Sequence, residues 1–506
     1  MRFFLLKKHY QNQLVAKAQK KYFFYFFCIT LIVMHVAIWT VFPSFLRGNL
    51  PLDAIEGITW AKHIDFGYDK NPFFYPWIIA FTINYISNAE WAIYFLSQLS
   101  VVTCFISIWI IARNILTPVH ALLSVILLES IQYYNIHTID FSDNTLELGI
   151  WGLISLFFYK AIENNKWYSW LLFGVFSGIG IVTKYYTVIL LTSILLFLLM
   201  YKENHKFFKN KFLYLGAICC LLIVLPNIIW LAKHDFSTLI YTASRASTSK
   251  SHLYFPAKFL FEQLQNLIIP FILLCCFKRS ANFNYNNTHN TYLFFLGVAP
   301  LLLTLAVSLF FGLKLRAAWG QPLLSFWGII LIVLMQPQIT KSGIIKFSIL
   351  FSLLGTIVIG LYSSALLHPT KPKTANFPGK EISDKVTKVW HEKYNSSLKY
   401  TAGGRWLAGN IAYYSNDKPE VFIDYDKKKN TSVDHDNLKK HGAVFVWDLT
   451  KLNRRLEEPY EKVKERYPEL LPPEKVQFAW QGNLNLEHAE ILVAFLPPTP
   501  PSQPSP

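Results

Sequence analysis

Apolar residues fill this chain in runs of about 20 positions, and short polar segments separate the runs. A helix of that length crosses the hydrocarbon core of a bilayer. The pattern therefore predicts a polytopic α-helical membrane protein with about eleven spans. The predicted spans cover residues 22–43, 91–112, 119–136, 146–162, 167–183, 185–201, 212–231, 257–277, 292–313, 319–335 and 345–367.

One further apolar run, residues 73–86, is only about 14 residues long and suits a helix at the membrane interface better than a crossing. The segment before the first span carries lysine and arginine but no acid, which predicts a cytoplasmic N-terminus. No small-residue cleavage site follows, so we expect the first span to stay as an anchor. With an odd number of spans, the C-terminus and residues 44–86 lie outside.

The character of the chain changes after residue 367. Residues 368–378 form a Pro/Lys-rich linker, and beyond it charged positions alternate with short apolar runs. The runs at 419–425, 443–448 and 490–495 predict strands, and 380–394, 405–415 and 452–466 predict helices. We therefore expect a transmembrane domain over 1–367, a periplasmic α/β domain over 368–496 and a disordered Pro-rich tail over 497–506.

Composition supports membrane insertion over nucleic-acid binding. The chain is 53% hydrophobic and carries a formal net charge of +17, but much of its lysine and arginine flanks the predicted spans. That placement is typical of membrane topology signals, so no nucleic-acid partner is expected. All six cysteines lie inside apolar runs, which provides neither a disulfide framework nor a zinc motif.

Charged residues gather in the segments that this topology places outside. They include the acids Asp53, Glu56, Asp69 and Asp143 and the cations Lys70, Lys184 and Arg316. Such a mixture suits the transfer of a group from a phosphate: the cations bind the phosphate, and a carboxylate accepts a proton from the incoming nucleophile.

Each of these residues also has a purely structural interpretation. Asp53 and Glu56 have the spacing of a capping box, so both could start a short helix at position 54. Asp143 precedes a span and could be its N-cap. Lys184 could mark the turn between two spans, and Arg316 could anchor the following one. Asp69 and Lys70 could form an exposed ion pair of small energetic value.

Several short motifs occur in an order that resembles one superfamily. The motifs are Leu52-Asp53-x-x-Glu56-Gly57-x-x-Trp60, Gly67-Tyr68-Asp69-Lys70-Asn71-Pro72, Phe141-Ser142-Asp143-Asn144, Gly178-x-Gly180-x-x-Thr183-Lys184-Tyr185, Arg316-Ala317-Ala318-Trp319-Gly320-Gln321-Pro322 and Trp406-Leu407-Ala408-Gly409-Asn410-Ile411-Ala412-Tyr413-Tyr414. In these motifs the chain is similar to the C-type membrane glycosyltransferases that use polyprenyl-phosphate sugars, in the bacterial branch related to protein O-mannosyltransferases and lipid A aminoarabinose transferases.

The resemblance implies juxtamembrane helices in the first outer loop and an inverting transfer of a monosaccharide from undecaprenyl phosphate. It implies that Asp53 is the general base, that Asp143 is a second acid, and that Lys70 and Lys184 bind the donor phosphate, with Arg316 as a further phosphate ligand. The superfamily's usual Asp-Glu pair is split here by two residues, which leaves the catalytic role of Glu56 open.

A divalent metal ion is the one cofactor that the resemblance suggests. Asp69 stands where some lipid A transferases have a metal-contacting Glu, and His234, His252 and His368 are the histidines that their position would allow near it.

The sequence thus predicts a glycosyltransferase of the bacterial inner membrane whose active site faces the periplasm. Its expected partners are a polyprenyl-phosphate sugar donor, membrane lipids, and a lipid or glycan acceptor such as lipid A or another envelope glycan. The competing hypotheses are a protein O-glycosyltransferase, a flippase or transporter of a lipid-linked sugar, and a non-catalytic assembly protein. A transporter would carry its ionisable groups in mid-span.

Overall fold

The structure is a computed structural model that describes residues 28–246, 252–283, 285, 289–426, 429, 433–450, 458–482 and 488–499. The start of the first predicted span, the first part of the predicted helix 452–466 and most of the Pro-rich tail lie outside these residues.

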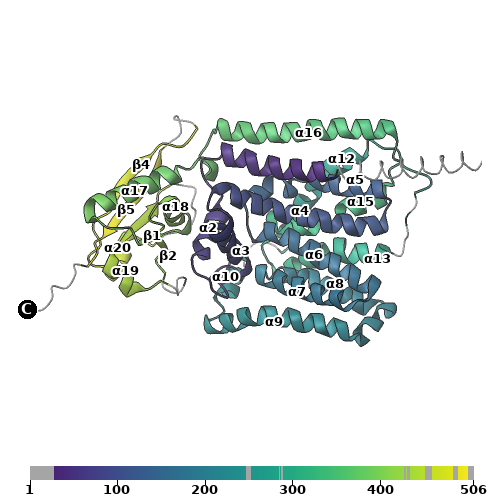
Figure 1. Cartoon of the computed structure of the whole chain (residues 1–506), viewed down its shortest axis with the longest axis horizontal. Helices are drawn as coiled ribbons and strands as arrows, with labels where there is room; N and C mark the ends of the chain where they lie inside the picture. The colour runs from purple at the N-terminus through teal and green to yellow at the C-terminus, as the bar shows by residue number, and fades with distance from the viewer. Residues whose placement is uncertain are drawn as a thin grey trace, which may run out of the picture.

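The membrane part is a bundle of long apolar helices packed side by side (Figure 1). Seven of its described helices are long and apolar enough to cross a bilayer. They are Cys28–Leu46, α4 (Glu90–Ile115), α6 (Asp143–Asn164), α9 (Lys211–Lys233), Tyr254–Leu274 with α11 (Tyr254–Asn266) and α12 (Ile268–Leu274), Asn290–Phe311 with α13 (Asn290–Leu293), η6 (Phe294–Val298) and α14 (Ala299–Phe311), and α16 (Lys341–Leu367). The chain is therefore a multi-pass membrane protein, as predicted.

Two further predicted spans are bent. Helix α8 (Thr187–Met200) turns by 108° into η4 (Lys202–Lys209), and the 3₁₀ segment Ala317–Leu324 turns by 62° into α15 (Trp327–Met335). Counting each bent pair as one span gives up to nine among the described residues. The expected continuous helix over 319–335 is wrong, because Pro322 starts a separate 3₁₀ turn, η8 (Pro322–Leu324), before α15.

The remaining two predicted spans are shorter helices. Helix α7 (Trp167–Thr183) has the predicted bounds, whereas α5 (Pro118–Glu129) ends well before residue 136. The Asn135 side chain donates hydrogen bonds to the carbonyls of Glu129 (2.7 Å) and Ile131 (3.2 Å). The amide thus satisfies backbone groups that a longer helix would have paired internally. Two 3₁₀ turns, η2 (Gln132–Tyr134) and η3 (Ile136–Ile139), follow.

The segment between the first span and α4 contains the predicted small helices. Helix α2 (Leu52–Ala61) and helix α3 (Phe74–Phe81), which continues into the π-turn η1 (Thr82–Ile86), lie at the end of the bundle that faces the C-terminal domain (Figure 1). Helix α10 (Ser237–Ala246) lies at the same end.

The C-terminal part contains a five-stranded mixed sheet in the order β2-β1-β3-β5-β4. Strand β1 is parallel to β2 and β3, whereas β5 is antiparallel to β3 and β4. The strands are β1 (Tyr400–Gly403), β2 (Glu420–Ile423), β3 (Ala443–Asp448), β4 (Glu474–Phe478) and β5 (Ala489–Leu496), and the helices are α17 (Gly379–Tyr394), α18 (Arg405–Tyr414), α19 (His435–His441) and α20 (Tyr460–Arg466). The three predicted strands and the helices at 380–394 and 405–415 are confirmed, while β1, β4 and α19 are additions.

Helix α18 packs directly on α2. A Cβ atom at Gly409 would lie 2.8 Å from both Ile55 Cγ2 and Thr59 Oγ1, so only glycine allows this approach. At the other end of α18, the Tyr414 hydroxyl donates to Glu90 Oε1 (2.6 Å) and accepts from the Leu50 amide (3.1 Å). One buried apolar cluster runs through both parts of the chain, so the C-terminal sheet is held against the segment that carries α2 and α3.

Candidate functional site

Helix α2 carries Asp53 and Glu56 on one face, because their spacing of three residues is close to one helical turn. The helix starts at Leu52, and its N-cap, Pro51, makes no side-chain capping bond. The capping-box interpretation is therefore wrong, since Asp53 already lies inside the first turn. Glu56 is buried, whereas the Asp53 side chain keeps 34% of its surface exposed.

Lys70 connects the two acids of α2. Its ammonium donates to Glu56 Oε2 and lies 3.7 Å from Asp53 Oδ1 and 5.9 Å from the centre of the Trp60 ring. Burial alone would lower the pKa of Lys70, but the charges of Glu56 and Asp53 outweigh it and raise this pKa above its usual value. Lys70 therefore stays protonated, and its interpretation as half of an exposed pair with Asp69 is wrong.

A second acid and lysine face each other where α6 begins. Lys184 lies in the break between α7 and α8, and its ammonium is 3.7 Å from Asp143 Oδ2 and donates to Asn144 Oδ1. The N-cap of α6 is Ser142, whose hydroxyl accepts from the Thr145 amide at 3.4 Å. Asp143 is thus not the N-cap, and its carboxylate faces the ammonium of Lys184 instead.

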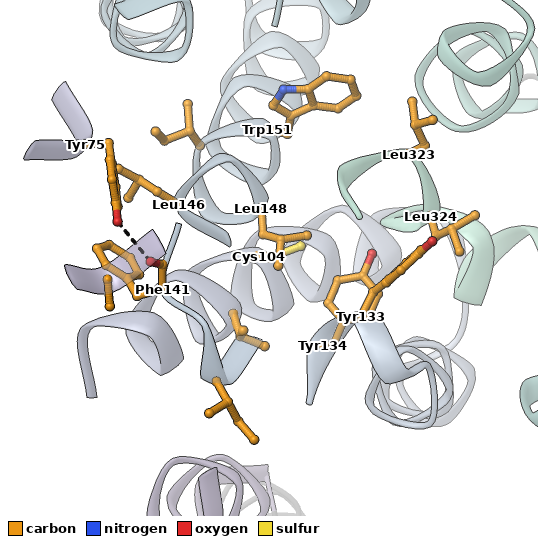
Figure 2. Packing of buried hydrophobic residues seen from close by; sticks show 14 of the residues in the cluster. Tyr75, Cys104, Tyr133, Tyr134, Phe141, Leu146, Leu148, Trp151, Leu323 and Leu324 are labelled. Atoms are coloured by element: carbon orange, nitrogen blue, oxygen red, sulfur yellow. Dashed lines mark hydrogen bonds between the residues drawn. The ribbon is translucent and has the colours of Figure 1, made fainter. Parts of the chain in front are cut away.

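Tyr75 of α3 joins the two acid–lysine pairs. Its hydroxyl lies 2.7 Å from the Asp53 carbonyl oxygen and 3.0 Å from the Phe141 carbonyl oxygen, so its one proton is shared between these two acceptors. Figure 2 shows the contact with Phe141 beside the buried residues that support α6. Burial raises the pKa of Asp53; Lys70 lowers this pKa, whereas the charge of Glu56 raises it further. Asp143 and Lys184 act on the same carboxylate, so the two pairs share one electrostatic environment.

The structure adds two acids to the predicted set. Burial raises the pKa of Asp140 well above its usual range, and the nearby charge of Asp53 adds to this effect, while Arg47 opposes it. Glu147 lies one turn along α6 from Asp143 and is fully buried; its Oε1 accepts from Trp151 Nε1 (3.0 Å) and Thr187 Oγ1 (3.1 Å). A carboxylate inside an otherwise apolar span was the sequence signal for Glu147.

The largest addition is Arg405, the first residue of α18. Its guanidinium is buried and binds Glu56 Oε1 through Nη1 (2.7 Å) and Asp69 Oδ2 through Nη2. Asp424 Oδ2, after β2, lies 3.7 Å from the same Nη2. The only local signal was an arginine at the start of an apolar helix, and nothing in the sequence points to partners some 350 residues earlier.

The segment that begins at Arg316 contacts the site through the side chain of Trp319. Arg316 itself is exposed, while Trp319, three residues later, lies under the ammonium of Lys184, 5.8 Å from it. The Tyr133 hydroxyl donates to the Ala317 carbonyl at 2.7 Å and fixes the segment to the bundle. The structure thus brings together Asp53, Glu56, Lys70, Asp143 and Lys184, and connects the segment after Arg316 to this group through Trp319.

The described residues near Asp69 do not form a ready set of ligands for a divalent metal. Within the described ranges, no three His, Cys, Asp or Glu side chains form a group that could hold an ion. Asp69 binds a guanidinium, and His234 and His252 direct their Nδ1 atoms at the carbonyls of Trp230 (2.8 Å) and Leu309 (2.9 Å). We derive no step through a metal, and its participation stays a prediction.

Comparisons with known proteins agree with this fold. Residues 70–230 match the sequence model of the dolichyl-phosphate-mannose-protein mannosyltransferase family. The structure aligns with ArnT from Cupriavidus metallidurans bound to undecaprenyl phosphate, with a TM-score of 0.56 and 12% identity over 92% of this chain and 97% of that one. No curated protein sequence matches the chain.

Two other solved structures align at lower scores. They are the arabinofuranosyltransferase AftD from Mycobacteria (TM-score 0.45, 11% identity, 93% of this chain and 42% of that one) and the oligosaccharyltransferase AglB from Archaeoglobus fulgidus (TM-score 0.38, 10% identity, 83% and 70%). The family match and the ArnT fold confirm the resemblance to C-type membrane glycosyltransferases that the sequence motifs predicted.

Proposed function

We propose that the protein is an inverting glycosyltransferase that moves a monosaccharide from undecaprenyl phosphate to an acceptor at the periplasmic face of the inner membrane. The observation that carries this proposal is the gathering of two aspartate–lysine pairs, Asp53 with Lys70 and Asp143 with Lys184, at one end of the bundle. The match to a mannosyltransferase family and the fold of a protein bound to undecaprenyl phosphate support it.

The reaction needs a base, a phosphate site and a fixed geometry. Asp53, which is only partly buried, accepts the proton of the acceptor hydroxyl. The acceptor oxygen then bonds to the anomeric carbon from the face opposite the phosphate, and the bond from that carbon to the phosphate oxygen breaks. Polyprenyl phosphate leaves with the electron pair, and Lys70 and Lys184 stabilise the added charge.

The acceptor is proposed to be lipid A or another glycan of the cell envelope. A phosphate-linked leaving group is stable as an anion, so no acid is needed to protonate it, and the site's second aspartate is free for another task. Asp143, held by Lys184 and Asn144, is placed to orient the acceptor instead. Alignment of donor and acceptor supplies a large part of the acceleration.

A specific observation also favours the transporter hypothesis as second candidate. His35 Nδ1 and Glu129 Oε2 lie 2.7 Å apart inside the bundle, and both residues line an apolar cavity of about 420 Å³ between the helix Cys28–Leu46, α4, α5, α12 and α16. Ionisable pairs within spans are typical of transport pathways. The transporter hypothesis gives no role to the two aspartate–lysine pairs, Asp53 with Lys70 and Asp143 with Lys184, so we place that hypothesis second.

Proteoliposomes that contain the purified protein and a radiolabelled undecaprenyl-phosphate sugar separate these functions. Transfer predicts that label moves to an acceptor from the cell envelope and that Asp53→Asn abolishes this movement at unchanged protein level. A transporter would move intact donor between leaflets with or without Asp53. An intact donor on its original side would contradict both. Mass spectra of lipid A with and without the gene would then name the sugar and the acceptor.

A further inference from the structure

We propose that Arg405, from the C-terminal domain, is a positioning residue that prepares Lys70 to bind the donor phosphate by holding Glu56. This inference rests on the proposed function, in which Lys70 is a phosphate ligand. Arg405 itself does not need to touch the donor, because its guanidinium is already occupied by carboxylates.

The two oxygens of Glu56 are divided between two cations. Oε1 accepts from Arg405 Nη1 at 2.7 Å, and Oε2 accepts from Lys70. A carboxylate fixed at one oxygen has a fixed direction for the other, so Arg405 determines where Glu56 presents its acceptor to Lys70. Lys70 is thereby held 3.7 Å from Asp53, the proposed base.

Both cations, Arg405 and Lys70, lie over the ring of Trp60. Its ring lies 5.6 Å from the Arg405 guanidinium carbon and 5.9 Å from the Lys70 ammonium. Cations near an aromatic face keep their charge while losing contact with water. Both cations are largely buried, with 4% of the Arg405 side chain and 22% of the Lys70 side chain exposed, so neither can move freely.

Charge balance gives Arg405 a second effect on the phosphate. The carboxylates around it, Asp69, Glu56 and Asp424, raise the pKa of Arg405 against the opposing effect of burial, so the residue is always charged. Asp424 in turn accepts from Lys429 at 2.8 Å. Removing Arg405 would leave these acids facing the phosphate site with fewer cations, and an anion would bind less well.

The test compares affinity for a short-chain prenyl phosphate, which does not require turnover. We expect Arg405→Gln to weaken this affinity at least about tenfold and to lower kcat by about a hundredfold, as misplacement of a site does. Arg405→Lys keeps the positive charge but loses the planar guanidinium that binds two carboxylates at once. Its affinity for prenyl phosphate should lie between those of wild type and Arg405→Gln. Lys475→Gln is the control, because Lys475 of β4 pairs with Glu490 at the edge of the same sheet that lies opposite β2 and Asp424.

A double-mutant cycle with Glu56→Gln separates positioning from general stability. If Arg405 acts through Glu56, the double variant binds prenyl phosphate no worse than Arg405→Gln alone, because the acid through which Arg405 acts is already absent. A merely structural arginine would give losses that multiply. If Arg405→Gln does not fold, Arg405→Gln with Asp69→Asn, which removes the unpaired buried acid, replaces it in the cycle.

Each outcome decides the inference. Wild-type affinity in Arg405→Gln, or losses that multiply in the double variant, would overturn the role of Arg405. A wild-type protein that binds prenyl phosphate but transfers no sugar would overturn the proposed enzyme and still leave the binding cycle to decide Arg405. A wild-type protein that binds no prenyl phosphate would overturn both.

Discussion

The ammonium of Lys184 lies 3.7 Å from Asp143 Oδ2, the same separation that Lys70 keeps from Asp53. In each pair the lysine donates its hydrogen bond elsewhere, to the neutral amide of Asn144 or to the carboxylate of Glu56. The two lysines thus face their aspartates alike but differ in the partner that a phosphate would have to replace. Because an amide gives up a cation more easily than a carboxylate does, Lys184 is the more available of the two.

This difference predicts unequal effects of removing the lysines. Lys184→Gln should weaken the binding of prenyl phosphate more than Lys70→Gln does, and each loss should exceed about tenfold, the size of one direct charge contact. Titration calorimetry with a short-chain prenyl phosphate measures both. Lys388→Gln is the control, since the Lys388 side chain is 74% exposed. Equal affinities of both variants and wild type would contradict the phosphate site.

Asp53 couples activity and stability to pH in opposite directions. Burial raises the pKa of Asp53, so between its unfolded and folded values the folded state binds more protons, and stability falls as pH rises through that window. Asp53→Asn should therefore melt at a higher temperature than wild type at neutral pH. The difference should vanish below about pH 4, where the unfolded aspartate is protonated as well.

The same pKa shift predicts the acid limb of the pH–rate profile. Because the base must be ionised, the transfer rate should fall on acidification at a higher pH than an ordinary aspartate would give. Initial rates measured from neutral pH downward, with donor held at saturation, test this. An acid limb at the ordinary aspartate value would argue against Asp53 as the base.

Tyr75 should contribute to both fold and rate. Tyr75→Phe removes the hydroxyl that the Asp53 and Phe141 carbonyls share, which costs about 1–3 kcal/mol of unfolding free energy when buried acceptors lose their donor. We also expect kcat to fall while donor affinity stays close to wild type, because the lysines remain. Tyr85→Phe is the control, since Tyr85 is 78% exposed. A stable Tyr75→Phe with normal kcat would show that this link is dispensable.

The packing of α18 on α2 can be tested with one methyl group. Gly409→Ala places a Cβ 2.8 Å from Ile55 Cγ2 and Thr59 Oγ1, which forces the two helices apart. We expect a loss of about 1–3 kcal/mol, typical of overpacking, and a lower transfer rate. Gly360→Ala is the matched control, because no atom lies within 4 Å of the added Cβ. Thermal melting and turnover of both variants give the comparison.

The sequence predicted those parts of the structure that follow from local patterns. The apolar runs located the helices, and the motifs around Asp53, Lys70, Asp143 and Lys184 identified residues that the fold brings together. Helix ends were less predictable where side chains compete with the backbone, as Asn135 does beyond α5. Strand β1 (Tyr400–Gly403) was missed because its sequence, Tyr-Thr-Ala-Gly, contains no run of large apolar residues and ends in glycine, whereas the equally short β2 contains Val421-Phe422-Ile423.

The contribution of the C-terminal domain could not be predicted from local patterns. Position 405 was correctly expected to start a helix, but helix propensity says nothing about the direction of a guanidinium. The contact between Arg405 and Glu56 joins two segments that are 349 residues apart, and no local sequence pattern links them. The role of Glu56 was left open because two residues separate it from Asp53, and the sequence could not show that its second partner, Arg405, lies in another part of the fold.

The bond between Glu56 and Arg405 also sets the order in which the protein can mature. These residues are 349 positions apart, and a ribosome that adds about 5–20 residues per second needs roughly 20–70 s to cover that distance. During this interval α2 has been synthesised, but the arginine that binds Glu56 and Asp69 has not. The end of the bundle that faces the C-terminal domain therefore becomes complete only when synthesis is nearly finished. A chain truncated before α18 would carry the acids and lysines of the site without their arginine partner.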